Sequence, residues 1–198
     1  ELVAFMRHFI FKKEINFLAD TKLEQAMFGM GCFWGAEKKY WDLEGVKLTA
    51  VGYAGGVSKS PNYQDVCTGL TGHNEVVKLL FDPTEVNYTQ LLTIFWENHD
   101  PTQKNRQGND IGTQYRSGAY YFSEAQKDTI FETKEMYGQS MRKAGFGSIM
   151  TEIKNAPEFF LAEDYHQQYL AKNPQGYCGL GGTGISLTMK SETSIEAL

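Results

Sequence analysis

The stretch from Gln25 to Gly35, QAMFGMGCFWG, decides the fold because it predicts a buried strand that turns directly into a helix. Residues 25–30 form a short apolar run of strand length. Glycines on both sides of Cys32 permit a sharp turn at that point. Apolar and aromatic residues then recur at helical spacing, namely Phe33, Ala36, Tyr40 and Trp41. We therefore expect a helix over about 33–43, with Cys32 at its start.

Outward from this corner, the pattern predicts a mixed α+β domain. Further strands are expected over 46–53, 76–81, 119–122 and 149–153. Two capping boxes, Asn87 with Gln90 and Ser123 with Gln126, begin two helices, and Gly145 ends the second. Because the strands are few, we predict a two-layer ferredoxin-like sandwich with a mixed sheet, not a doubly wound fold.

Three segments are expected along the chain. Residues 1–24 form an N-terminal arm, and residues 25–172 form the catalytic α+β domain. Residues 173–198 form a long coil tail that carries Cys178. Its many glycines predict wide conformational freedom.

The composition of the 198-residue chain excludes several classes of protein. Hydrophobic residues make up 41% and aromatic residues 14%, which excludes a chain that is disordered throughout. A formal charge of −5 argues against a nucleic-acid-binding surface, which requires basic residues. No apolar run approaches the roughly 18–20 residues that cross a bilayer. We therefore expect neither nucleic acid nor membrane as a partner.

The cysteines indicate reduced thiols. Cys32, Cys67 and Cys178 lie far apart, without a C-x-x-C pair, and the four histidines lack metal-ligand spacing. This pattern argues against a disulfide scaffold and against a metal site. The apolar N-terminal stretch precedes its two lysines, which reverses the order of a secretory signal. We expect a cytoplasmic location and leave a mitochondrial or other organellar form open.

Cys32 is the candidate nucleophile because of its predicted place at the start of a helix. A thiol there faces unpaired backbone N–H groups and the positive end of the helix dipole, which lowers the thiol pKa. Phe33 and Trp34 add an aromatic wall beside it. The alternative is a buried structural cysteine, which is the commonest fate of a free thiol. Composition alone does not separate the two.

The segment Met30-Gly31-Cys32-Phe33-Trp34-Gly35 resembles the motif of the peptide-methionine sulfoxide reductase A family. More motifs similar to that family follow in order: GYAGG at 52–56, Tyr63, VC at 66–67, TGHNE at 71–75, FWENHDP at 95–101, RQGND at 106–110, GTQYRS at 112–117, AEDYHQQYL at 162–170 and GYCG at 176–179. The resemblance covers roughly residues 26–186. It implies an oxidoreductase that repairs oxidative damage by reducing methionine S-sulfoxide, free and in proteins.

The resemblance implies catalytic roles that agree with the chemistry of the residues. Cys32 attacks the sulfoxide and becomes a sulfenic acid. Glu75 protonates the departing oxygen, so it must stay protonated near neutral pH, and this requires a desolvated pocket. The hydroxyls of Tyr63 and Tyr115 donate hydrogen bonds to that oxygen.

Substrate binding is implied for three further residues. Phe33 and Trp34 enclose the S-methyl group, and Asp110 supports the substrate or the tyrosine network. Ile111 stands where the family usually has histidine. This change spares Asp110 and Tyr115.

Cys178 resembles the resolving cysteine of the family. A disulfide requires Cα atoms within about 7 Å, so a partner distant in sequence must move in, and the glycine-rich tail permits that motion. The resemblance implies a Cys32–Cys178 disulfide that thioredoxin, or another dithiol, reduces. Many family members carry one more cysteine shortly after the resolving one, whereas residues 184–188 have none. We therefore expect thioredoxin to attack the disulfide directly.

Other reactive side chains are expected to be structural. Cys67 is predicted to be a buried free thiol. His166 is predicted to pair with Asp164 near the site, and His73 either orients its loop or takes part in acid–base chemistry.

Two rival functions remain at this point: a cysteine-based thiol peroxidase and a non-enzymatic module that binds oxidised methionine. The family leads us to expect a monomer with no bound cofactor.

Overall fold

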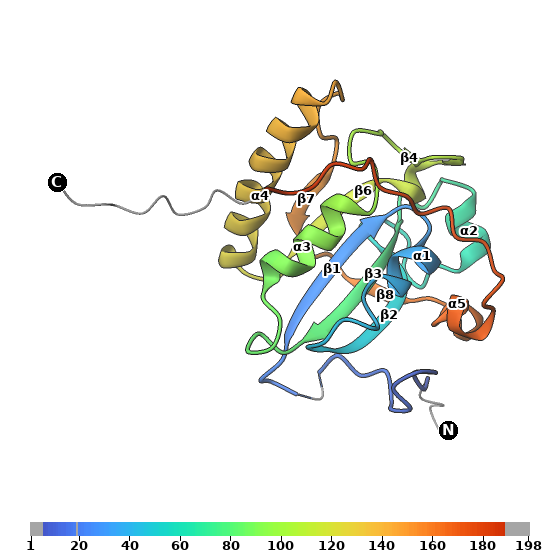
Figure 1. Ribbon diagram of the computed structural model, residues 1–198. Helices are drawn as coiled ribbons and strands as arrows, with labels where there is room; N and C mark the ends of the chain where they lie inside the picture. The colour runs from blue at the N-terminus through green and yellow to red at the C-terminus, as the bar shows by residue number, and fades with distance from the viewer. Residues whose placement is uncertain (1–5, 19, 189–198) are drawn as a thin grey trace.

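Residues 6–18 and 20–188 are described by the computed structural model, and their strands form a mixed six-stranded sheet and a small hairpin (Figure 1). The sheet strands are β1 (Glu24–Met30), β2 (Val46–Ala54), β3 (Asn74–Phe81), β6 (Ser117–Tyr121), β7 (Glu152–Asn155) and β8 (Phe159–Leu161). Their order is β7-β6-β1-β3-β2-β8, and every neighbouring pair is antiparallel except β6 with β7. The hairpin joins β4 (Arg106–Gln107) to β5 (Asp110–Ile111). The predicted α+β class with a mixed sheet is confirmed.

The α-helices of the described residues are α1 (Phe33–Lys38), α2 (Tyr63–Cys67), α3 (Tyr88–Glu97), α4 (Glu124–Lys143) and α5 (Tyr169–Lys172). Two 3-10 turns, η1 (Thr113–Tyr115) and η2 (Asp164–His166), complete the set. The main core lies between the sheet and the helices α1, α3 and α4, where Phe28 of β1 stacks on Phe95 of α3 at 5.1 Å between ring centres.

From Ala26 to Met30, strand β1 is apolar because both of its faces are buried there. Ala26, Phe28 and Met30 belong to the main core under the helices. Met27 points to the opposite face and packs in a separate cluster with Val76. Successive side chains of a strand alternate between faces, so a strand covered on both sides reads as an unbroken apolar run.

Both predicted capping sites begin helices, although only one forms a complete box. Asn87 and Gln90 exchange both hydrogen bonds at the start of α3. At α4, Ser123 Oγ accepts from the backbone N–H of Gln126, but the Gln126 side chain accepts from Phe122 instead of Ser123.

The predicted glycine stop of α4 is confirmed. Gly145 has a φ of +86° and donates to Arg142, and Phe146 donates to Met141. This bonding pattern is a Schellman motif, which satisfies carbonyl groups at the end of a helix.

Several predicted boundaries are wrong. Helix α1 ends at Lys38, because the next backbone bonds, such as Tyr40 to Glu37, tighten from i→i−4 to i→i−3 spacing. Strand β7 begins at residue 152 and not at 149. Helices α2 and α5 and strand β8 were not predicted, because an element of three to five residues is too short to show a period.

The C-terminal segment 173–188 is coil, yet it lies along the helix side of the sheet and contacts helices α3 and α4 (Figure 1). The backbone N–H of Leu187 donates to Glu97 at 2.7 Å, and the Tyr137 hydroxyl donates to the carbonyl of Ile185 at 3.2 Å. The described part therefore differs from the freely moving tail that its glycines predict. Residues 189–198 of the predicted tail, and 1–5 and 19 of the predicted arm, lie outside the described residues.

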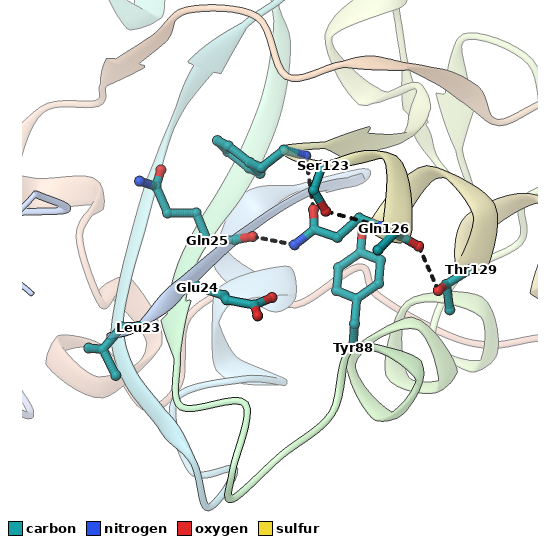
Figure 2. Close-up of a pocket in the computed structure, with 9 residues that line it drawn as sticks. Leu23, Glu24, Gln25, Tyr88, Ser123, Gln126 and Thr129 are labelled. Atoms are coloured by element: carbon teal, nitrogen blue, oxygen red, sulfur yellow. Dashed lines mark hydrogen bonds between the residues drawn. The ribbon is translucent and has the colours of Figure 1, made fainter. Parts of the chain in front are cut away.

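A cavity of about 470 Å³ opens where β1, α3 and α4 begin (Figure 2). Its lining residues are Leu23, Glu24, Gln25, Tyr88, Phe122, Ser123, Ala125, Gln126 and Thr129. Gln126 joins two of its sides, because its Nε2 donates to the carbonyl of Gln25 at 2.8 Å. Cys32 follows the other end of β1, roughly 20 Å away at the ~3.3 Å rise of each strand residue. This cavity is therefore distinct from the region around Cys32.

Over residues 6–18 and 20–188, no helix combines the length and the apolar character that a membrane crossing requires.

Candidate active site

Cys32 caps the N-terminus of α1, as predicted, and only 9% of it is exposed. Burial, with a smaller contribution from the nearby carboxyl of Glu75, raises the pKa of its thiol to about 12. The backbone N–H groups of Trp34 and Gly35 act in the opposite direction, although the Cys32 side chain forms no capping hydrogen bond in this structure. The prediction of a lowered pKa is therefore wrong, because two N–H groups of a six-residue helix do not offset burial beside a second acid.

Glu75 of β3 is a buried acid, 2% exposed, that faces the start of α1. The backbone N–H of Phe33 donates to its Oε2 at 3.1 Å. Burial, and to a smaller extent the nearby Asp110, raise its pKa to about 8 against the opposing effect of the bond from Phe33. Glu75 is therefore mostly protonated at pH 7, which is the state that a proton donor requires.

Cys32 and Glu75 share a cavity of about 140 Å³. Its lining residues are Cys32, Phe33, Trp34, Tyr63, Glu75, Asp110, Tyr115 and Tyr177. The set comes from α1, α2, β3, β5, η1 and the C-terminal segment, so no single stretch of sequence contains it. Seven of the eight predicted site residues line this cavity, and the eighth, Cys178, does not.

Tyr177 is a lining residue that the sequence analysis missed. Its hydroxyl lies 3.4 Å from both carboxyl oxygens of Asp110, and half of its surface is exposed. Burial raises the pKa of Asp110, and the bond from Tyr177 lowers it. Its position within the GYCG motif at 176–179, next to Cys178, was the available signal.

The two predicted tyrosines keep their protons in this cavity. Burial raises the pKa of Tyr63 and of Tyr115. A phenol that keeps its proton is a hydrogen-bond donor. Both hydroxyls are therefore suited to stabilise an oxygen that gains negative charge.

Trp34 forms an aromatic wall of the cavity, and Tyr169 and His166 fix the position of its ring. Its ring stacks on Tyr169 with 3.8 Å between centres and 14° between planes. Its indole N–H donates to Nδ1 of His166 at 2.9 Å. The predicted pairing of His166 with Asp164 is wrong, because His166 contacts Trp34 through one nitrogen and approaches Glu163 through the other.

Cys178 is exposed and lies beside α1, close to Gly35. A side-chain Cβ at Gly35 would meet the Cys178 sulfur at 3.1 Å, so the missing side chain leaves room for this cysteine. All three cysteines are free thiols in this structure.

Cys67 is also exposed, at the end of α2, so its predicted burial is wrong. The ring of His73 is engaged on both sides, by the backbone N–H of Gly56 and the carbonyl of Ser58. These bonds favour the loop-orienting role for His73. Within the described residues, no group of three or more His, Cys, Asp or Glu side chains is placed to hold a metal ion.

Comparisons with known proteins point to one family. The family model described as "Peptide methionine sulfoxide reductase" matches residues 24–194. The chain is 56% identical over 191 residues to peptide methionine sulfoxide reductase MsrA 1 of Synechocystis, covering 96% of this chain and 86% of the relative.

Solved structures agree with that match. Methionine sulfoxide reductase A of Corynebacterium diphtheriae is 41% identical, with a TM-score of 0.79 over 87% of this chain and 84% of that one. Mxr1 from Saccharomyces cerevisiae in complex with Trx2 is 27% identical, with a TM-score of 0.52 over 76% of this chain and 87% of that one.

Proposed function

The chain belongs to the peptide methionine sulfoxide reductase family, and on this premise we propose that methionine sulfoxide is reduced in the Cys32 cavity. The protein is an oxidoreductase that reduces methionine sulfoxide to methionine. One observation carries the assignment to this cavity: a buried acid that is neutral at pH 7, Glu75, shares 140 Å³ of space with the thiol of Cys32.

The first step transfers one oxygen atom from sulfur to sulfur. Glu75 gives its proton to the sulfoxide oxygen, and the sulfur of Cys32 attacks and accepts that oxygen. The thiol proton of Cys32 returns to Glu75, so the products are methionine, a cysteine sulfenic acid and a re-protonated Glu75.

The remaining cavity residues bind and orient the sulfoxide. Tyr63 and Tyr115 donate to its oxygen, and Asp110 supports the substrate from the hairpin. Phe33 and Trp34 enclose the S-methyl group, so that the S epimer alone presents its sulfur to Cys32.

Cys178 then resolves the sulfenic acid. Its thiol displaces the hydroxyl as water and forms the Cys32–Cys178 disulfide. The position of Cys178 beside Gly35, three residues from Cys32, supports this role. A dithiol protein of the thioredoxin type reduces the disulfide, and the complex of yeast Mxr1 with Trx2 supports such a partner.

The finer architecture belongs to the same proposal. The order β6-β1-β3-β2, with α1 linking β1 to β2 and α3 linking β3 towards β6, supports a ferredoxin-like description. We divide the chain into the arm 1–24, the catalytic domain 25–172 and the tail 173–198. We also propose a cytoplasmic monomer that needs no bound cofactor.

The thiol peroxidase alternative is not favoured. Such an enzyme also requires a reactive cysteine and a resolving one, but it requires neither an aromatic enclosure for a methyl group nor a neutral carboxylic acid. Peroxide turnover without sulfoxide turnover would support it.

Mass spectrometry of the reduced chain after one equivalent of methionine sulfoxide tests the proposal. We expect the chain to lose two hydrogens and to yield one linked pair of peptides containing Cys32 and Cys178. A Cys32→Ser variant should release no methionine. A Cys178→Ser variant should release one equivalent and then stop, and continued turnover with thioredoxin would show that Cys178 is not the resolving residue.

A further inference from the structure

We propose that Glu163 is a positioning residue for sulfoxide reduction, because it holds both Tyr63 and Trp34 in the walls of the Cys32 cavity. The inference rests on the proposed function and assigns a role to a side chain outside the cavity lining. Glu163 lies two residues after the end of β8. Its backbone carbonyl accepts a hydrogen bond from the backbone N–H of His166. One residue therefore begins the η2 turn and also faces two walls of the site.

The contact with Tyr63 is a backbone hydrogen bond. Tyr63 is the first residue of α2, and Glu163 Oε1 accepts from its backbone N–H at 3.1 Å. The N-cap side chain of Asn62 serves Asp65 and leaves the Tyr63 N–H to Glu163. A five-residue helix is too short to be stable alone, so its position depends on such tertiary contacts.

The contact with Trp34 passes through His166. Because an indole N–H only donates, the Nδ1 of His166 must be the acceptor, and the ring proton therefore sits on Nε2. Burial lowers the pKa of His166 to about 4, so the ring is neutral. Its Nε2 is buried and lies 3.3 Å from Glu163 Oε2, outside good hydrogen-bond geometry. We therefore assign this approach as an electrostatic contact that favours the Nε2–H tautomer.

Glu163 also receives two tyrosine hydroxyls. Tyr53 of β2 and Tyr165 of η2 each donate to its Oε2 at 3.2 Å. With the backbone N–H of Tyr63, three hydrogen-bond donors converge on the two carboxyl oxygens, and Nε2 of His166 approaches one of them. The two oxygens of a carboxyl side chain accept all three bonds at once, whereas an amide places a donor NH₂ group on one side. Glutamine at position 163 would keep an acceptor for only one side, and the tyrosine hydroxyls on the other side would have to turn from donors to acceptors.

The test compares Glu163→Gln with Glu158→Gln, a matched change at an exposed residue five positions earlier. Each reduced protein is mixed with an excess of a methionine sulfoxide peptide and no reductant, and methionine release is followed in time. For Glu163→Gln we expect about one equivalent released, about tenfold to a hundredfold more slowly at saturation, because a misplaced catalytic geometry costs that much. We also expect a several-fold higher half-saturating concentration and a shifted indole N–H signal of Trp34 in ¹H–¹⁵N spectra.

Glu163→Asp separates a positioning role from a structural one, because it keeps two acceptor oxygens on a shorter stem. We expect it to recover part of the rate lost in Glu163→Gln, while Glu158→Gln behaves like the unchanged protein. An unchanged rate in Glu163→Gln would overturn the inference, and so would a reduced yield of methionine at an unchanged rate. Absence of methionine release from the unchanged protein would instead count against the proposed function.

Discussion

Replacing Glu75 by glutamine should stabilise the folded protein although it removes the proposed proton donor. The pKa of Glu75 rises from 4.5 to about 8 on folding, because the site is desolvated. Because Glu75 has a higher pKa in the folded protein than in the unfolded chain, its contribution to the free energy of unfolding is complete below pH 4.5. That contribution is lost as the pH rises towards 8.

The magnitude follows from proton linkage. At pH 7 the unfolded chain has released the Glu75 proton, whereas the folded chain has kept it. The cost of keeping it grows with each pH unit above 4.5, which is about 2.5 units at pH 7. At about 1.4 kcal/mol per unit, holding this acid neutral costs about 3 kcal/mol at pH 7, and burying it ionised costs about 5 kcal/mol above pH 8. Glutamine is neutral and of the same shape, and its carbonyl retains an acceptor for the N–H of Phe33.

Denaturant unfolding of both proteins at pH 5, 7 and 8.5 measures the difference in unfolding free energy. We expect less than about 1 kcal/mol in favour of Glu75→Gln at pH 5 and about 3 kcal/mol at pH 7. Glu37 is fully buried, with a pKa raised to about 7 by burial, but it is present in both proteins and cancels in the difference. Glu158→Gln controls for the loss of one carboxyl group at an exposed site. A difference that does not change between pH 5 and 8.5, or a less stable variant at pH 7, would refute the reasoning.

The remaining predictions concern the site and one helix end. Gly35→Ala should slow disulfide formation but not methionine release, because its Cβ would lie 3.1 Å from the Cys178 sulfur; equal slowing of both in a quenched time course would contradict this. Tyr63→Phe and Tyr115→Phe should each slow oxygen transfer about a hundredfold or more in single-turnover assays, since each removes one donor, and an unchanged rate would exclude that tyrosine. In unchanged protein the same rate should fall as pH rises through about 8, when Glu75 ionises; a rate that keeps rising would exclude Glu75 as the proton donor. Gly145→Ala should lower the unfolding free energy by about 1 kcal/mol, because φ is +86° there, and a denaturant curve that does not shift would show that the strain is relieved.

The regular part of the fold was predictable because it depends on local patterns. The apolar run of β1, the complete capping box of α3 and the glycine stop of α4 each depend on residues within a few positions of one another. Helices α2 and α5 were missed because a single turn has no period to detect. Their positions depend on contacts such as that of Tyr63 with Glu163, which are 100 residues apart in sequence.

The sequence alone determined the chemistry of this protein: which residues supply a thiol, a carboxylic acid and two phenols, and which family arranges them in that order. Only the tertiary structure decided that the Cys32 pKa rises instead of falling, that Tyr177 lines the cavity and that Glu163 stands behind two of its walls. A motif is defined by residue types in a fixed order along the chain, so the sequence is enough to recognise it. Burial and electrostatic contact depend on distances between segments far apart in the chain, and packing alone sets those distances.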